Sequence, residues 1–307
     1  MEPFIASDTL PETEEILETL SVGDLIASWE SDFGIDVERL FAGLETLHML
    51  KNSQTGQISF SPPVEGDAKF YQDLRKFDWY HPATKEEFAA AATYYRTGER
   101  ITDVGAGAGG FADHVPRNLY RGLETDEDAV GAAITKGLNV LNADMASFIA
   151  SDNFQTSGLV TAFQVLEHVR EPEAFIGELA ELACPGGRVA IGVPDAGSYV
   201  ADLPDFMMNA PPHHLTWWTE TALAAAMEKA GLRIIGTHRF NVEPWERQLW
   251  WMAKFAKLVR PQSLGRFGAA SRARKVASFA GSWALQKCPI PAAARGSTLL
   301  LLGEKSA

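Results

Sequence analysis

The chain has 307 residues, of which 46% are hydrophobic and 22% are charged, and this composition excludes a protein disordered along its whole length. Its two cysteines exclude a disulfide framework and a cysteine-rich zinc site. The net charge of −13 argues against a general nucleic-acid binder, which needs cationic surface to displace counterions from phosphates. Because the sequence shows neither a secretory leader nor an apolar run near the roughly 18 residues of a membrane span, we expect a cytoplasmic location.

The charge is distributed unevenly along the chain. Residues 1–60 contain twelve acids against two bases, whereas residues 241–296 contain ten bases against two acids. The basic segment has a balance of +8 inside a chain that is otherwise acidic. The exclusion of nucleic acid as a partner therefore applies to the main body of the protein and not to this segment.

The predicted elements fall into three parts. Residues 1–83 form an acidic helical stretch up to Leu50 and then a segment rich in proline and aromatic residues. From residue 84 onward, strand-like and helix-like segments alternate, which predicts an α/β fold with a mostly parallel sheet and helices on both faces. We expect helices at 84–95, 110–115, 127–136, 172–184 and 219–230, and strands at 100–104, 119–124, 139–141, 158–163, 188–193 and 232–239.

A last apolar strand at 297–303 follows the strand at 232–239 without the usual crossover helix between them. This arrangement predicts an antiparallel last strand, which completes a sheet of seven strands, with residues 241–296 as a helical insertion at the sheet edge. We divide the chain into an N-terminal extension (1–83), a cofactor-binding domain (84–240 with 297–307) and the basic insertion (241–296).

A glycine-rich turn from Gly105 to Gly110 lies where a strand leads into a helix. Glycines there let the backbone turn tightly and approach a ligand closely. Nineteen residues beyond Gly105, Glu124 closes the next strand, where a carboxylate can accept both hydroxyls of a ribose. The Gly105-x-Gly107-x-x-Gly110 spacing matches the dinucleotide fingerprint, so an NAD-dependent oxidoreductase is one interpretation.

A second interpretation starts from Asp103-x-Gly105-x-Gly107-x-Gly109, which resembles the first motif of class I S-adenosylmethionine (SAM) methyltransferases. Residues 163–169 and 182–191 resemble the later motifs of small-molecule members of that family, among them the ubiquinone-pathway O-methyltransferases. A bacterial branch of the family is also similar around Phe70-Tyr71 and in residues 209–215. The resemblance implies a Rossmann-like sheet over residues 84–240 and the last strand.

The resemblance also implies a SAM site, residue by residue. Carboxylates and aromatic faces suit a ligand that carries a positive sulfonium and no phosphates. Tyr80, with its neighbours Tyr71 and Trp79, either closes over the cofactor or acceptor or anchors the N-terminal segment as an aromatic plug. The remaining implied contacts are Asp103 near the ammonium group, Gly105, Ala106 and Gly107 along the methionine and adenosine, Glu124 at the ribose, Asp144 and Met145 at the adenine, and Phe163 and Gln164 under the sulfonium.

The catalytic prediction rests on histidines. Transfer to an oxygen needs alignment of the acceptor with the methyl group and removal of a proton, and imidazole titrates near neutral pH. His168, His213 and His214 are therefore the candidate bases. Glu167 and His168 with His214 are similar to the metal constellation of small-RNA 2′-O-methyltransferases, which implies a divalent ion on these three residues, although Gln164 stands where that constellation has a carboxylate. The alternative is that Glu167 and His168 orient the following helix.

We expect a SAM-dependent methyltransferase that acts on the oxygen of a small-molecule or saccharide-type acceptor. The alternatives are the NAD-dependent oxidoreductase and a non-catalytic SAM-fold scaffold that binds a partner. In the insertion, apolar residues recur at helical spacing, for example Val276, Phe279 and Trp283. These helices either cover the domain as a lid or homodimer contact, or dock on an anionic membrane or an acidic partner.

Overall fold

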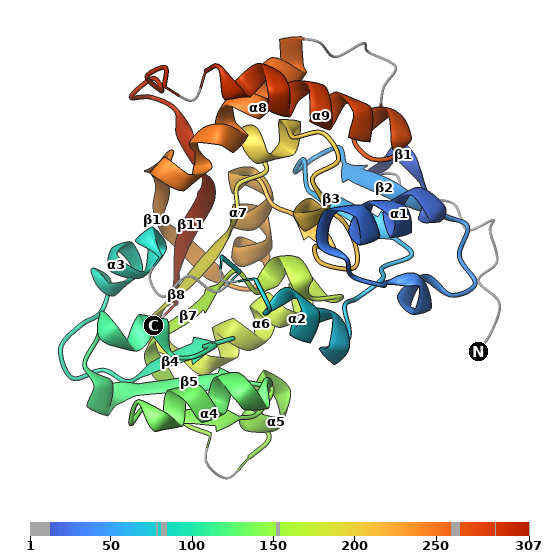
Figure 1. The fold of residues 1–307 in the computed structure, drawn as a ribbon. Helices are drawn as coiled ribbons and strands as arrows, with labels where there is room; N and C mark the ends of the chain where they lie inside the picture. The colour runs from blue at the N-terminus through green and yellow to red at the C-terminus, as the bar shows by residue number, and fades with distance from the viewer. Residues whose placement is uncertain are drawn as a thin grey trace.

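The computed structural model describes residues 13–77, 79–80, 85–151, 154–258, 265–285 and 287–306. Its larger sheet has seven strands, and Figure 1 shows it running through the centre and lower part of the molecule. The strands are β4 (Ile101–Val104), β5 (Tyr120–Glu124), β6 (Val140–Asn142), β7 (Ser157–Phe163), β8 (Ala183–Pro194), β10 (Leu232–Asn241) and β11 (Arg295–Lys305).

The order of this sheet is β10-β11-β8-β7-β4-β5-β6. Neighbouring strands from β8 to β6 are parallel, and β11 is antiparallel to both β8 and β10. Every residue of β4 and of β7 is buried, as expected for central strands covered on both faces. The predicted seven-stranded α/β sheet with an antiparallel last strand is confirmed.

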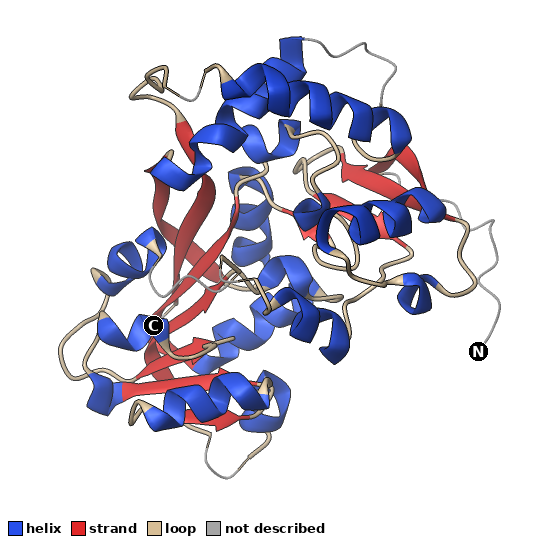
Figure 2. Cartoon of the chain, in the orientation of Figure 1, coloured by secondary structure: helices blue, strands red, loops and turns tan. Residues whose placement is uncertain are grey.

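Helices cover both faces of the sheet, as Figure 2 shows. One face packs on α5 (Met145–Ile149), α6 (Pro172–Leu182) and α7 (Glu220–Lys229) through the core cluster that contains Leu299 and Leu301. The other packs on α3 (Glu86–Ala92) and α4 (Glu127–Thr135) through the cluster that contains Leu300 and Leu302. Alternate residues of one strand thus enter opposite cores.

The N-terminal extension is not simply helical, and this prediction was wrong in part. It contains β1 (Glu14–Ser21), β2 (Thr46–Asn52) and β3 (Ile58–Ser61), which form a second, four-stranded sheet with β9 (Thr216–Trp217) in the order β1-β2-β3-β9. The two helices beside it are α1 (Val22–Phe33) and α2 (Ala68–Leu74). Because β1 is an edge strand, its glutamates can reach water, and an acidic composition therefore does not require a helix.

Local signals explain where α1 begins and ends. The Ser21 hydroxyl accepts a hydrogen bond from the Asp24 amide, which caps the first turn, and Gly34 adopts the left-handed conformation with φ +64° that ends the helix. The buried face of α1 carries Leu25 and Trp29, which pack into a separate core cluster with residues of β2 and β3.

Two helices, α8 (Arg247–Leu258) and α9 (Ala269–Trp283), lie between β10 and β11 and pack against each other. Figure 1 shows α9 along the upper edge of the molecule, reaching across to β1 and α1. There Arg272 pairs with Asp24 at 3.0 Å, and Lys275 pairs with Asp32. The acidic and basic segments from the two ends of the chain are therefore neighbours that neutralise each other.

Several boundaries differ from the prediction. The helix expected at 110–115 is a 3-10 helix, η2 (Gly110–Asp113), and the boundary at 83/84 lies outside the described residues. Within the described part of the chain, no helix is long and apolar enough to cross a membrane. The other 3-10 helices are η1 (Glu38–Phe41), η3 (Arg117–Leu119), η4 (Leu166–His168), η5 (Tyr199–Asp202), η6 (Met207–Asn209) and η7 (Pro244–Glu246).

Candidate active site

The carboxyl ends of β7, β4, β5 and β6 meet at one edge of the larger sheet, because these neighbouring strands are parallel. Ligands of open α/β sheets bind beyond this edge. Most of the predicted cofactor residues are collected there: Gly105, Ala106 and Gly107 after β4, Glu124 at the end of β5, Asp144 and Met145 after β6, and Phe163 and Gln164 at the end of β7.

The turn after β4 needs its glycines. Gly105 has φ +68°, and a Cβ added to it would lie 2.4 Å from a methyl of Val165. Gly107 has φ +53°, and a Cβ there would meet nothing within 4 Å. The turn therefore packs tightly on the chain at Gly105 and presents open backbone at Gly107.

The Glu124 carboxylate is fixed by backbone groups beside this turn. One oxygen accepts the Gly107 amide at 2.8 Å, and the other accepts the amides of Thr125 and Asp126 at 2.7 and 2.9 Å. The structure thus brings together the glycine turn and the acid that were predicted to share the cofactor. Glu124 stays half-buried, so its carboxylate can still be reached by a ligand.

Asp103 lies inside the sheet, 2% exposed. Its carboxylate accepts hydrogen bonds from the Thr161 hydroxyl at 2.6 Å and the Tyr120 hydroxyl at 2.9 Å, on the two neighbouring strands. Burial raises the pKa of Asp103 to about 6, against the effect of these two hydroxyls. Its position two residues before Gly105 places a buried negative charge under the glycine turn.

The residues predicted at the adenine divide into one surface group and one core group. Asp144 caps α5 by accepting the Ser147 amide at 2.6 Å, and this hydrogen bond lowers the pKa of its carboxyl. Met145 is buried in the core beneath it. At the end of β7, Phe163 packs edge-on against Phe88 with ring centroids 4.8 Å apart.

Gln164 adopts a positive φ of 59°, which is uncommon for a residue with a side chain. Its amide nitrogen donates to Glu87 of α3 at 3.2 Å. Glu87 is 3% exposed, and burial raises its pKa. The sequence analysis missed Glu87, although the acid stands on the apolar face of a helix next to Phe88 and four residues before Ala91.

The three predicted histidines form one cluster. The rings of His213 and His214 stack with centroids 4.4 Å apart, and the His168 ring lies 4.6 and 5.0 Å from them. One ring nitrogen from each residue lies within 4.8 Å of the others. Burial lowers the pKa of all three imidazoles, that of His168 to about 4, so they are neutral and can offer lone pairs.

Hydrogen bonds distinguish the three rings. Nδ1 of His213 donates to the Met208 carbonyl at 2.8 Å, and its Nε2 accepts from the Tyr80 hydroxyl at 3.0 Å, so both nitrogens are engaged. Nδ1 of His168 donates to the His213 carbonyl at 2.6 Å, which leaves Nε2 available. Tyr80, predicted at the cofactor, thus contacts the histidine cluster.

Glu167 lies beside the cluster and is 1% exposed. Within the described part of the chain, neither of its carboxylate oxygens has a hydrogen-bond partner, and one lies 3.8 Å from Nε2 of His168. Burial raises the pKa of Glu167 to about 8. A buried carboxyl group without a donor is costly, so this one calls for an explanation.

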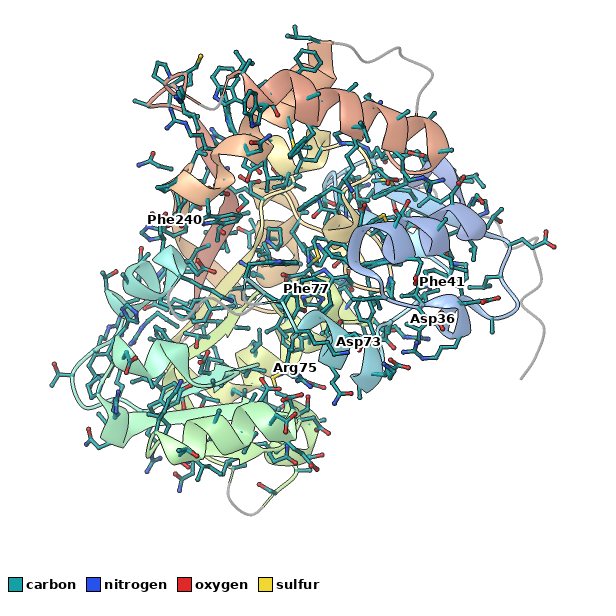
Figure 3. The ribbon with its side chains drawn as sticks, viewed as in Figure 1. Asp36, Phe41, Asp73, Arg75, Phe77 and Phe240 are labelled. Atoms are coloured by element: carbon teal, nitrogen blue, oxygen red, sulfur yellow. The ribbon has the colours of Figure 1, made fainter. Side chains whose placement is uncertain are left out.

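Contacts from α1 and from η4 hold the histidine loop in place. The indole nitrogen of Trp29 donates to the Pro211 carbonyl at 2.9 Å, and the Leu215 amide donates to the Glu167 carbonyl at 2.7 Å. Arg75, labelled in Figure 3, follows α2 and pairs with Asp126 at the start of α4. Trp29 was not singled out from the sequence, because nothing local connects it to a loop 182 residues away.

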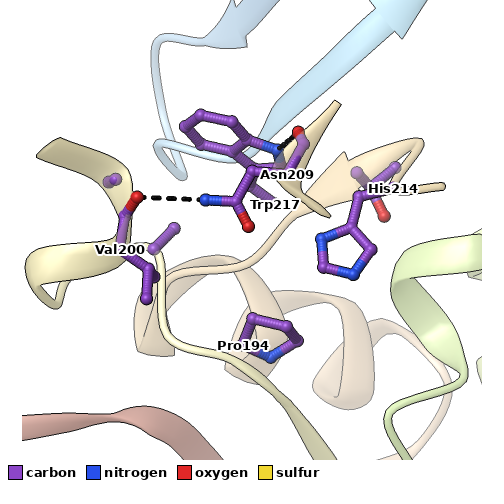
Figure 4. Close-up of a pocket in the computed structure, with 8 residues that line it drawn as sticks. Pro194, Val200, Asn209, His214 and Trp217 are labelled. Carbon is purple, nitrogen blue, oxygen red and sulfur yellow. Dashed lines mark hydrogen bonds between the residues drawn. The ribbon is translucent and has the colours of Figure 1, made fainter. Parts of the chain in front are cut away.

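A small cavity is lined in part by His214, and Figure 4 shows the ring and Val200 at opposite sides of the view, with Pro194 between and below them. Its volume of about 10 Å³ has room for roughly one water and none for an acceptor. The lining residues are Pro194, Ala196, Val200, Ala201, Asn209, His214, Thr216 and Trp217.

Comparison with known proteins gives a consistent answer. A family model described as a methyltransferase domain matches residues 78–237. The chain is 28% identical over 166 residues to a ubiquinone biosynthesis O-methyltransferase of Aeromonas salmonicida, covering 49% of this chain and 70% of that protein. A protein of the same name from Xanthomonas axonopodis is 25% identical over the same shares. These matches favour neither the oxidoreductase nor the scaffold interpretation.

Solved structures were compared as well. A SAM-dependent methyltransferase from Thermotoga maritima is 17% identical with a TM-score of 0.48, covering 78% of this chain and 97% of that chain. One from Archaeoglobus fulgidus is also 17% identical with a TM-score of 0.48, covering 78% and 100%.

Proposed function

The chain belongs to the methyltransferase-domain family and is a SAM-dependent methyltransferase, and we propose that it methylates a hydroxyl oxygen of a small-molecule or saccharide-type acceptor. The relatives named as O-methyltransferases support oxygen as the acceptor atom. The observation that carries the proposal is the buried Glu167 carboxylate, which has no donor among the described residues and lies beside neutral imidazoles.

In this proposal the cofactor lies across the carboxyl edge of the larger sheet. The open backbone at Gly107 and the Glu124 carboxylate beside it suit the ribose and the chain that leads to the sulfonium. The buried charge of Asp103 favours a cationic ligand above the turn. Phe163 and Gln164 end β7 next to the turn and form the floor under the methyl group.

The reaction is an in-line displacement. The acceptor oxygen forms a bond to the methyl carbon while the bond from that carbon to the sulfur breaks, which leaves S-adenosylhomocysteine. The hydroxyl proton passes to a base. His168 and His214 are proposed for this role because burial keeps their imidazoles unprotonated, whereas both nitrogens of His213 are engaged and suit a positioning role.

As an alternative to the base role of these imidazoles, we assign a divalent cation to Glu167, Nε2 of His168 and His214. The two roles exclude each other, because Nε2 is the nitrogen that the hydrogen bond of His168 to the His213 carbonyl leaves available, and a nitrogen that binds the ion cannot accept the proton. With the ion bound, the acidified hydroxyl would lose its proton to water.

His168 links the other two donors: its Nε2 lies 3.8 Å from the Glu167 carboxylate, which has no hydrogen-bond donor among the described residues, and ring nitrogens of His168 and His214 lie within 4.8 Å of each other. No hydrogen bond within the described part of the chain engages the ring of His214. Two imidazoles with one carboxylate suit Mn²⁺, Co²⁺ or Zn²⁺ better than Mg²⁺. Such an ion would orient the acceptor hydroxyl and lower its pKa.

The test is a titration of the full-length protein with Co²⁺, followed by its visible absorption, in parallel with calorimetric titration of SAM. Saturable Co²⁺ binding is expected in the wild type and is lost in Glu167→Gln and His214→Ala, while SAM affinity stays within about threefold. His114→Ala is the matched control, because His114 is an exposed histidine outside the cluster. It should leave both titrations unchanged.

The outcomes separate the two halves of the proposal. Absence of Co²⁺ binding together with normal SAM binding contradicts the assignment of the cation and leaves His168 and His214 proposed as bases without a metal ion. Absence of SAM binding in the wild type, with or without Co²⁺, contradicts the assignment of the cofactor edge itself.

A further inference from the structure

The helix α9 is amphipathic in the reverse of the usual sense. A surface helix normally buries its apolar side and exposes its charged side. The buried side of α9 instead carries Ser271, Arg274, Ser278 and Ser282. Its exposed side carries Val276, Phe279 and Trp283, which are 70%, 54% and 67% exposed, together with the exposed alanines 269, 270, 273, 277, 280 and 284.

The polar side of α9 is used inside the protein. Arg272 pairs with Asp24, Lys275 pairs with Asp32, and the Ser282 hydroxyl accepts a hydrogen bond from Gln248 of α8 at 3.0 Å. These contacts fix the rotation of the helix about its axis, so the apolar side must face outward. Arg272 and Lys275 are the cations that anchor the helix to α1.

Exposed cations lie in the same helical segment. Lys254 on α8 and Lys287 just after α9 are exposed, as is Lys257, which pairs with Asp202 at 3.5 Å, and Leu258 at the end of α8 is 85% exposed. Between residues 244 and 295 the sequence contains one acid, Glu246, and it is buried. Figure 1 shows α9 and the end of α8 together along one edge of the molecule, where a flat partner can reach both.

We propose that α9 and the end of α8 dock on a bilayer surface that carries anionic headgroups. Trp and Phe side chains favour the boundary between acyl chains and headgroups, and flanking lysines are attracted to anionic lipid. The charges argue against a second copy of the chain as the occupant, since a symmetric contact would bring these lysines against one another. The proposal is independent of the acceptor and of the cation.

The experiment is flotation of the full-length protein with vesicles of phosphatidylcholine alone, or of phosphatidylcholine and phosphatidylglycerol in equal amounts. At low salt we expect binding to the anionic vesicles, weakened about tenfold or more in the variant Phe279→Ser/Trp283→Ser. Charge reversal by Lys254→Glu and by Lys287→Glu should weaken it about fivefold each. Ile134→Ser on α4 is the control, because this side chain is 58% exposed on another face.

Equal melting temperatures of the variants establish that the substituted surfaces stay folded. Binding that is absent from the wild type, or unchanged in Phe279→Ser/Trp283→Ser, overturns the proposal. The proposal is also overturned, in favour of self-association, if the wild type does not bind vesicles but forms a dimer in sedimentation, and Phe279→Ser/Trp283→Ser abolishes that dimer.

Discussion

The cofactor edge and the histidine cluster are built in opposite ways. At the cofactor edge, consecutive residues after β4 meet the end of the next strand, and backbone groups make the decisive contacts, as between Gly107 and Glu124. In the histidine cluster, side chains from η4, the loop after η6 and the segment after α2 converge, and α1 supports them through Trp29. Local geometry builds the proposed cofactor edge, and tertiary structure builds the proposed acceptor side.

This difference predicts separable effects, of which the largest concerns the cluster. Glu167→Gln keeps the size of the side chain and removes the carboxylate that the proposed cation would hold ionised, so kcat should fall by about 10²–10⁴-fold while the Kd for SAM stays nearly unchanged. Single-turnover assays with radiolabelled SAM, beside calorimetric titration, measure both. An equal loss in kcat and in SAM affinity would show that the cofactor edge and the histidine cluster are not separable.

A smaller effect is expected inside the cofactor edge, from Asp103→Asn. The pKa of Asp103 is raised from 3.8 to about 6, so the folded state binds the proton more tightly than the unfolded state. Its contribution to stability is complete below pH 4 and is lost as the pH rises through 6, by about 3 kcal/mol. The difference in unfolding free energy between wild type and Asp103→Asn, from urea titrations between these pH values, should fall by this amount. A difference that does not change with pH would show that Asp103 ionises normally when folded.

A side chain at Gly105 in the glycine turn should lower the free energy of unfolding by about 2 kcal/mol. Gly105→Ala places a Cβ against Val165 at a positive φ, which costs both overpacking and backbone strain. Thermal unfolding and SAM titration should both report the loss. Gly131→Ala is the matched control, since a Cβ there meets nothing within 4 Å in the helix α4 and should stabilise by up to about 1 kcal/mol.

The smallest effect tests the support of the cluster by α1. Trp29→Phe keeps an aromatic ring and removes the hydrogen bond to the Pro211 carbonyl, which should cost about 1 kcal/mol of stability. Because the histidine pair begins two residues after Pro211, the affinity for Co²⁺ should fall while that for SAM does not. A loss of SAM affinity instead would show that α1 also shapes the cofactor edge.

The larger sheet and its antiparallel last strand could be predicted because each buried strand is a short apolar run bounded by turn residues. The glycine turn and Glu124 could be paired from their spacing alone. By contrast, β1 was missed because an edge strand rich in acids has a composition typical of a helix, and β2 was missed although it is an inner strand without acids. Trp29 could not be found because its partner is set by tertiary packing, and the local signal for Glu87 was its place on the apolar face of a helix.

The small sheet has a consequence for the order in which the protein can fold during synthesis. Strand β3 ends at residue 61, but its partner β9 begins at residue 216. The ion pairs of α1 cannot form until α9 has been synthesised. At the usual rate of translation, β9 follows β3 from the ribosome by roughly 10–30 s. The strands β1 to β3 are therefore made before the larger sheet, their sheet is completed only after most of that sheet has been made, and their apolar surface has to be kept from aggregating in the meantime.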